Sequence, residues 1–240
     1  MTLPSAPPPP PPPPPQPPSP ALPLAPVRKR RAAPVRTRDA RATRARLIRA
    51  ALDLFTSQGF HGTTTPEIAR RAGVAEATIY RHFTSKEALL TAACLEAQSY
   101  GRELIVAEAT DGDDARLALG KIGRHLAELA QRDPAMLRML LRPPEEALEA
   151  EPARRGVREF REALQQLVAA GKQRGQIRSG SAELWAAVWL ALAGFVAEQV
   201  AAVGGGGGWA PDHQNVEQAL GAAWEAIAYR RPETPVTVVI

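Results

Sequence analysis

The segment TTTPEIARRAGVAEATIYRHFTSK, residues 63–86, decides the fold, because capping and turn residues outline two short helices within it. Thr64 and Glu67 have the spacing of a capping box, in which each side chain can bond the backbone amide of the other residue. A helix is therefore predicted over residues 65–72. Gly73 follows it, and glycine is the residue that most often ends a helix in the left-handed conformation.

A second helix is predicted over residues 76–83, after a turn of about four residues. Ile79 and Phe83 are four residues apart, so they share one face and are expected to point into a core. The outward residues are then Thr78, Tyr80, Arg81 and His82. Two short helices joined by a glycine-centred turn form a helix-turn-helix, and the second helix has the size that fits a DNA major groove.

A further helix is expected before this segment, because apolar residues recur there at helical spacing and end at a glycine. These residues are Leu47, Ile48, Ala51, Leu54 and Phe55, followed by Gly59 and Phe60. The phrase T-T-x-x-E-I-A-x-x-A-G-V-x-x-x-T-I-Y-x-H-F-x-S-K-E-A-L-L, together with this helix, resembles the N-terminal signature of the TetR repressors. The resemblance covers about residues 41–90.

The resemblance implies an all-helical homodimer with a three-helix DNA-binding domain and a larger helical domain that binds a small molecule and dimerises. It implies double-stranded DNA as the partner and places contacts at Thr64, Thr65, Thr78, Tyr80, Arg81 and His82, with Lys86 at a phosphate. Two positions depart from the family pattern. Ala75 stands where a Ser or Thr cap is usual, which should cost the second helix about 1 kcal/mol. Glu76 is better suited to accept from a cytosine amino group than to approach a phosphate.

Composition favours an all-α fold, with 45% apolar residues, only 5% aromatic residues and almost no strand signal in 240 residues. Charge is uneven along the chain. Residues 1–90 contain 14 Lys and Arg against 5 Asp and Glu, a net charge of +9, whereas residues 91–240 contain 16 against 20, a net charge of −4. A basic N-terminal part on a mildly acidic body predicts that a polyanion is bound at one end only.

A cytoplasmic location is expected for three reasons. The single cysteine, Cys94, excludes an internal disulfide and a cysteine-rich metal site. The N-terminus lacks the charged-then-apolar order of a signal peptide. The most apolar stretch, residues 184–197, is uncharged over only 14 residues, whereas a membrane span needs about 20. No membrane association is predicted.

The N-terminal residues 1–36 contain 16 of the 24 prolines, so this leader is expected to be polyproline II without a core. A passive tail is favoured over a ligand for a proline-recognising partner, and translation from Val27 or Val35 is a further alternative. Arginines and a lysine then dominate residues 28–46. Because this run precedes the helix-turn-helix, Arg36 and Arg38 are expected to belong to an arm along phosphates or in a minor groove.

The remaining chain predicts a helical bundle. Helices are expected over residues 84–106, 114–131, 134–141, 153–174, 181–203 and 212–229, with an acidic connector before residue 153. In terms of domains, residues 1–36 are the disordered proline-rich leader and basic arm, 37–86 the DNA-binding domain, 87–230 the ligand-binding and dimerisation domain, and 231–240 a tail. The helix 181–203 is apolar nearly all round, which requires a second partner.

Two sets of residues in this bundle carry functional predictions. A homodimer interface is predicted from the last two helices, through Val188, Leu192, Phe195, Leu220, Trp224 and Ile227. A small-molecule effector pocket is predicted between facing helices, with Phe160, Leu164, Trp185, Trp189, His125 and Arg138 as candidate walls. Few charges accompany these side chains, so the effector is expected to be apolar or weakly anionic.

No enzyme activity, metal site or cofactor is predicted. The four histidines are scattered, and neither a nucleophile motif nor a phosphate-cradling glycine loop is present. The favoured function is therefore a DNA-binding regulator, a repressor that binds a palindromic operator as a homodimer and is released by its effector. A constitutive regulator without a ligand is an alternative, and a helical enzyme or adaptor is a weaker one.

Overall fold

The computed structural model describes residues 35–109, 114–202 and 212–229, with the side chains of residues 35–38 left out. These residues form an all-α fold, as predicted, in which the nearest thing to a sheet is one isolated antiparallel bridge between Ile177 and Ala228. The helices are α1 (Val35–Gly62), α2 (Thr65–Ala72), α3 (Glu76–His82), α4 (Lys86–Glu108), α5 (Ala115–Arg132), α6 (Pro134–Leu141), α7 (Glu145–Leu148), α8 (Glu151–Gln173), α9 (Ala182–Ala201) and α10 (His213–Glu225).

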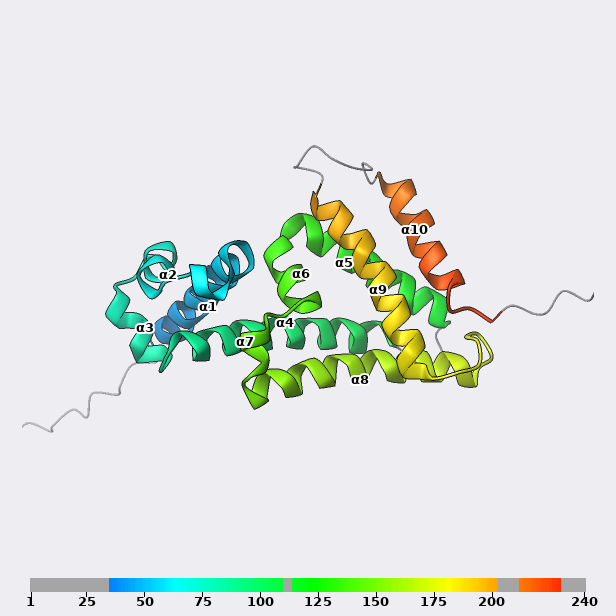
Figure 1. Ribbon diagram of the computed structural model, residues 1–240, viewed down its shortest axis with the longest axis horizontal. Helices are drawn as coiled ribbons and strands as arrows, with labels where there is room; N and C mark the ends of the chain where they lie inside the picture. The colour runs from blue at the N-terminus through cyan, green and yellow to red at the C-terminus, as the bar shows by residue number, and fades with distance from the viewer. Residues whose placement is uncertain (1–34, 110–113, 203–211, 230–240) are drawn as a thin grey trace, which may run out of the picture.

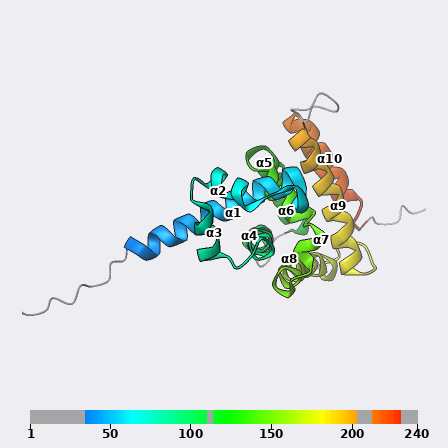
Figure 2. The ribbon, with the colours of Figure 1, turned by 60° about the vertical axis from the view of Figure 1, so that its left-hand side comes forward.

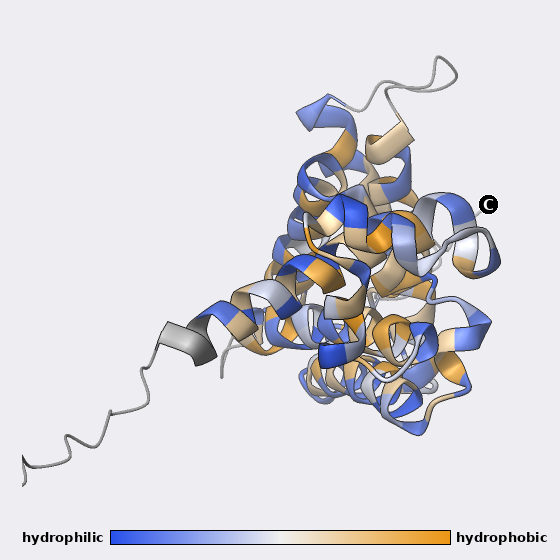
Figure 3. Cartoon of the chain, turned by 90° about the vertical axis from the view of Figure 1, so that its left-hand side faces the viewer, coloured by the Kyte–Doolittle hydropathy of each residue, from blue (hydrophilic) through white to orange (hydrophobic). Residues whose placement is uncertain are grey.

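The helices are arranged around α4, which runs from the helix-turn-helix end to the far end of the molecule (Figure 1). α1 packs on its first turns, α2 packs on α1 and α3 on α2, and α8 lies parallel along the rest of α4. α5, α6, α9 and α10 form a second layer, in which α9 and α10 lie side by side (Figure 2). Hydrophobic and hydrophilic residues alternate along most helices, which is the pattern of amphipathic helices packed on a shared core (Figure 3).

Short polar side chains fix where five of the ten described helices begin. Ser85, Asp114, Asp133, Ser181 and Asp212 each accept a hydrogen bond from a backbone amide of the first turn that follows. Such caps satisfy amides that have no partner within the helix. One expectation needs correction, because Ser85 caps α4 and Thr84 lies outside it. The predicted acidic connector also contains the one-turn helix α7.

α1 is longer and more bent than the sequence indicated. It begins at Val35, so the backbone at Arg36 and Arg38 is already helical rather than part of an extended arm. Residues 1–34 lie outside the described residues, as does the predicted tail. The helix is interrupted at Gly59, which has φ 77° and ψ 169°. This region of backbone space is open essentially only to glycine, which explains the end of the apolar pattern there.

The effector pocket predicted in the core is closed by packing. Phe160, Leu164 and Trp189 do meet, but the void between them measures only about 10 Å³, enough for one water molecule at most. The other candidate walls lie elsewhere. The Trp185 indole donates to the Ser179 carbonyl at 3.0 Å, and Arg138 donates to the Thr56 carbonyl of α1 at 3.3 Å.

His125 also lies away from this void. Its Nδ1 lies 3.1 Å from the carbonyl oxygen of Lys121, one turn earlier in α5, and 3.8 Å from the Glu108 carboxylate.

The predicted dimer residues separate into two groups. On α10 and just after it, Leu220, Trp224 and Ile227 are buried within the subunit, so they are core residues and cannot face a partner. Leu220 packs so closely on Gly123 of α5 that a β-carbon there would lie 2.6 Å from it. The α9 residues Val188, Leu192 and Phe195 lie on the outside.

α9 is, among the described helices, the one with the length and composition of a membrane span, a test that core helices of soluble proteins also pass.

Candidate nucleic-acid interface

The turn between α2 and α3 has the geometry that the sequence predicted. Gly73 adopts φ 67° and ψ 40°, the left-handed conformation. Its amide donates to the Arg70 carbonyl, and the Val74 amide donates to the Ala69 carbonyl at 3.0 Å. These bonds satisfy carbonyls at the end of α2 and reverse the chain within a few residues. The chain then enters α3 at Ala75, where no side chain caps the helix.

α3 is held by its inner face. Ile79 is fully buried and Phe83, which ends the helix, is 6% exposed. The guanidinium of Arg44, on α1, lies 5.1 Å from the centre of the Phe83 ring, within cation–π range. Because the inner face of this short helix is held by these contacts, its opposite face is presented to solvent.

That outer face contains the residues predicted to meet DNA. Tyr80 is 56% exposed and Arg81 is also exposed, whereas Thr78 and His82 are half-buried. Arg81 has no hydrogen-bond or ion-pair partner among the described residues. A guanidinium that no carboxylate occupies presents all five donors, and arginine is the residue that most often reads guanine in the major groove.

A polar cluster links the two helices of the motif across this face. The Thr65 hydroxyl donates to the Glu76 carboxylate at 3.0 Å and lies 3.4 Å from the Tyr80 hydroxyl. Glu76 was predicted to accept from a cytosine. Its carboxylate instead has an acceptor role within the protein, at the junction of α2 and α3. The cluster sets the spacing of the two helices, and Thr65 and Tyr80 keep exposed polar atoms at its edge.

At the start of α2, Thr64 is engaged by Glu67. The Glu67 carboxylate accepts from the Thr64 amide at 3.0 Å and from the Thr64 hydroxyl at 2.9 Å. These two hydrogen bonds, the amide bond first, lower the pKa of Glu67 below its ordinary value. Thr64 is exposed and can still contact a phosphate. To donate its hydroxyl to that phosphate, it must share or give up the hydrogen bond to Glu67.

Lys86, predicted to contact a phosphate, is bonded within the protein. Its ammonium donates to the carbonyls of Phe60 and Thr63, at 3.0 and 3.1 Å, and lies 4.1 Å from the centre of the Phe60 ring. The side chain therefore binds the carbonyls at the end of α1 to the first turn of α4. We infer that Lys86 joins these two helices, and its contact with a phosphate stays a prediction.

Sequence reasoning missed a charged network that connects the helix-turn-helix with α6. Asp53 of α1 accepts from Arg71 of α2 at 2.8 and 3.1 Å and also pairs with Arg49. Arg49 in turn donates to Asp133, whose other carboxylate oxygen caps α6. The i, i+4 spacing of Arg49 and Asp53 was the available signal. It indicated a pair on one helix but not the partners on α2 and α6.

A second missed residue is the buried Gln98 of α4. Its amide nitrogen donates to the Leu140 carbonyl at 3.0 Å, while its amide oxygen is buried without a partner. The sequence gives no periodic signal for it, because a glutamine in a helix is ordinarily exposed. Gln98 therefore ties α4 to the end of α6, just as Arg49 ties α1 to its beginning.

Residues 47–93 match the family model described as bacterial regulatory proteins, tetR family. The chain is 38% identical over 104 residues to the uncharacterized HTH-type transcriptional regulator YvkB of Bacillus subtilis, an alignment that covers 43% of this chain and 53% of YvkB. It is 49% identical over 53 residues to the HTH-type transcriptional regulator TcmR of Streptomyces glaucescens, covering 22% and 24%. The chain thus matches about half the length of the first of these relatives and less of the second.

Two solved structures extend the similarity to the whole fold. A TetR family transcription regulator from Marinobacter aquaeolei VT8 superposes with a TM-score of 0.66 at 22% identity, over 81% of this chain and all of the other. A TetR-like regulator from Rhodococcus sp. RHA1 gives a TM-score of 0.60 at 17% identity, over 76% and 93%. Residues 47–93 thus form a DNA-binding domain of the TetR family, and the chain as a whole shares the fold of these regulators.

Proposed function

We propose that this protein is a transcriptional repressor that binds a palindromic DNA operator as a homodimer and is released by a small-molecule effector. The observation that carries the proposal is the outer face of α3, where Arg81 stands exposed and unpaired among the described residues on a helix whose inner face is fixed. A rigid helix with a free guanidinium suits base recognition in the major groove. A DNA partner also supports a cytoplasmic location.

Homodimerisation is supported by the exposed apolar face of α9. Leu184, Leu192 and Phe195 are 52%, 40% and 59% exposed, and half-buried Val188 lies among them. Large apolar residues in one helical stripe are unusual on a monomer surface and mark an interface. A second copy seated on this face would make a two-fold dimer, with recognition helices entering successive major grooves about 34 Å apart.

An effector response is supported by the ties between α6 and the rest of the molecule. α6 is bonded to α1 through Arg49 and Asp133 and to α4 through Gln98. A ligand that favours one position of α6 thereby biases both helices next to α3. The core between Phe160, Leu164 and Trp189 has no room for a ligand, which favours the alternative of a constitutive regulator. An open groove beside α6 favours a regulator that responds to an effector.

The test is a mobility-shift assay with genomic fragments, followed by single-base variants of the operator that it yields. Arg81→Ala should weaken specific binding by about 1–3 kcal/mol, roughly 5- to 150-fold, and should lose discrimination mainly at one base pair of each half-site. Non-specific binding should change much less.

Arg102→Ala is the matched control, because Arg102 is exposed on α4 and its substitution removes the same charge at a distance from α3. It should bind operator variants with wild-type ranking. If Arg81→Ala also keeps that ranking, Arg81 does not read a base. If wild-type protein shifts no genomic fragment, the proposed function is wrong.

A further inference from the structure

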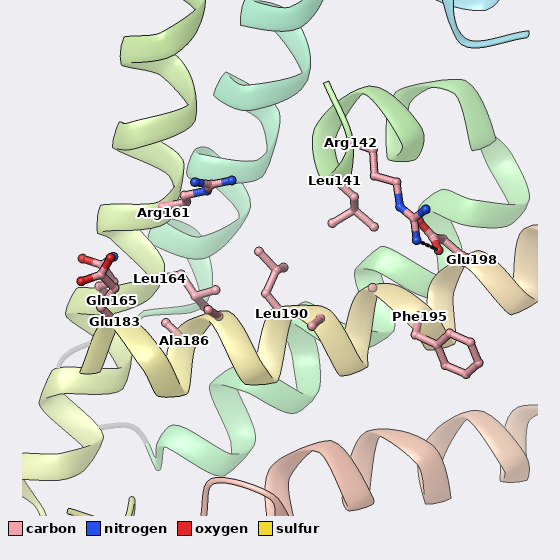
Figure 4. A pocket seen from close by; sticks show the side chains of 13 residues that line it. Leu141, Arg142, Arg161, Leu164, Gln165, Glu183, Ala186, Leu190, Phe195 and Glu198 are labelled. Carbon is pink, nitrogen blue, oxygen red and sulfur yellow. Dashed lines mark hydrogen bonds and ion pairs between the residues drawn. The ribbon is translucent and has the colours of Figure 1, made fainter. Parts of the chain in front are cut away.

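An open groove lies between the end of α6, the middle of α8 and one face of α9. It measures about 480 Å³, within the range of small-molecule sites. Its floor is apolar, formed mainly by Leu141, Leu164 and Leu190. Figure 4 shows Leu141 and Leu190 between two charged groups, with Arg161 on one side and the pair of Arg142 and Glu198 on the other. We call this space the α6–α8–α9 groove.

The groove is distinct from the proposed dimer face. Successive residues of a helix are about 100° apart, so Ala186, Leu190 and Gly194 form one stripe of α9. Leu192 and Phe195 belong to the neighbouring stripe, although Phe195 also borders the groove. A second copy on the outer stripe therefore leaves the floor of the groove facing α6 and α8.

The charges of the groove are not equivalent. Arg142 donates to Glu198 at 2.7 Å, so each neutralises the other. Glu183 lies in the first turn of α9, where the helix N-terminus favours a negative charge. Arg161 has neither an ion-pair partner among the described residues nor a helix end that would favour its charge. It is exposed in the middle of α8 without a hydrogen-bond or ion-pair partner among the described residues, and Arg158 lies one turn before it.

We propose that the α6–α8–α9 groove binds an amphipathic carboxylate, with the carboxylate on Arg161 and the hydrocarbon over Leu141, Leu164 and Leu190. A guanidinium offers two parallel donors to a carboxylate, a geometry that gives both strength and orientation. The apolar floor contributes in proportion to the hydrocarbon area that it covers. The inference rests on the proposed effector response, for which it names the ligand class and the site.

A ligand in the groove would contact α6, the helix that is bonded to both α1 and α4. Leu141 is the last residue of α6 and packs on Gly194, where a β-carbon would lie 3.2 Å from it. It directly follows Leu140, whose carbonyl accepts from Gln98 of α4. A hydrocarbon chain against Leu141 therefore presses on the end of α6 that is bonded to α4.

The experiment is isothermal titration calorimetry of the full-length protein with dodecanoate, dodecanol and dodecyltrimethylammonium, all below micelle formation. Dodecanoate should bind at least about tenfold more tightly than dodecanol, and the cation should bind most weakly. Arg161→Gln should reduce the affinity for dodecanoate to that for dodecanol. Arg161→Lys should retain part of the difference, because it keeps the charge but not the paired donors.

Two matched variants locate the site. Arg155→Gln removes the same charge from α8 outside the groove and should bind dodecanoate as wild type does. Ala187→Phe places a ring in the groove and should weaken dodecanoate and dodecanol alike. Equal affinity for dodecanoate and dodecanol, an unchanged Arg161→Gln variant or no binding at all would each overturn the proposal. Mobility shifts without ligand are measured in parallel, so that loss of the groove proposal is separable from loss of DNA binding.

Discussion

At the scale of single residues, several polar side chains near α3 are already hydrogen-bonded within the protein when no DNA is bound. The Thr65 hydroxyl is bonded to Glu76, and the Thr64 hydroxyl to Glu67. In each case a carboxylate holds a hydroxyl beside the start of α2. The proposed interface is therefore pre-organised, which lowers the conformational entropy that binding must remove.

Lys86→Ala is expected to destabilise the protein by about 1–2 kcal/mol, because it removes two charge-assisted hydrogen bonds from a half-buried ammonium. Urea unfolding measures this. Lys121→Ala is the control, since the pair of the exposed Lys121 with the half-buried Glu108 is long, at 3.4 Å, and should contribute less than about 0.5 kcal/mol. Wild-type stability of Lys86→Ala, with weaker binding to all DNA, would return Lys86 to the phosphate role.

Glu67→Gln should make the protein less stable at neutral pH but not at acid pH. The folded pKa of Glu67 is lowered by its bonds to Thr64, so its contribution is fully present above the ordinary value of 4.5 and is lost as pH falls through the folded pKa. Melting temperatures of wild type and variant should converge between about pH 7 and pH 3. Thr64→Val, which removes only the hydroxyl donor, should show a smaller difference. A gap independent of pH would exclude this carboxylate as its source.

The site residues show where sequence reasoning succeeds and where it stops. Ile79, Phe83 and Arg81 were assigned to the correct faces of α3, because a 3.6-residue period fixes the direction of each side chain. The partner of Lys86 was not predictable from the same pattern. It depends on the bend at Gly59, which brings the Phe60 and Thr63 carbonyls back towards α4.

At the scale of elements, α6 is short but is bonded at both ends. Asp133 caps its first turn and pairs with Arg49, and the Leu140 carbonyl near its last residue accepts from Gln98. A helix of eight residues has little stability of its own, so these ties and its buried leucines hold it. α6 is therefore a well-placed element for coupling the groove to the helix-turn-helix.

Gly59→Ala is expected to destabilise the protein by about 1–3 kcal/mol, because an L side chain at φ 77° and ψ 169° is strained wherever it points. Gly62→Ala is the matched control in the same helix. A β-carbon there meets only the Gln58 β-carbon at 3.6 Å, so the change should be neutral or stabilising by up to about 1 kcal/mol. Equal effects of the two changes in a denaturant titration would show that the bend carries no strain.

At the scale of the whole molecule, helix order and most helix ends followed from caps and periodicity, but the neighbours of each face did not. Trp224 and Leu192 both belong to apolar stripes of the last two helices. Trp224 packs into its own subunit, whereas Leu192 remains exposed. A helical pattern shows that a face is apolar without showing which face covers it, because that depends on contacts between residues far apart in sequence.

The Leu192→Glu and Phe195→Glu double variant should dissociate the proposed dimer. Burying two carboxylates in an apolar interface should weaken association by at least about 2 kcal/mol, roughly 30-fold, and operator affinity should fall with it. Sedimentation velocity at micromolar concentration measures the change. Leu117→Glu, at a 58% exposed leucine of α5, should leave the mass unchanged. A wild-type monomer at that concentration would end the dimer proposal.

The unbroken course of α4 also has a mechanical consequence. Its 23 residues form a rod about 35 Å long, capped by Ser85 beside the DNA-binding face. A rod of that length magnifies small rotations, so a tilt of about 5° about its far end moves the near end by about 3 Å. That displacement is close to the roughly 3.4 Å rise between successive nucleotides of one DNA strand. A tilt of α4 by only a few degrees is thus enough to shift α3 by about one base step along the DNA.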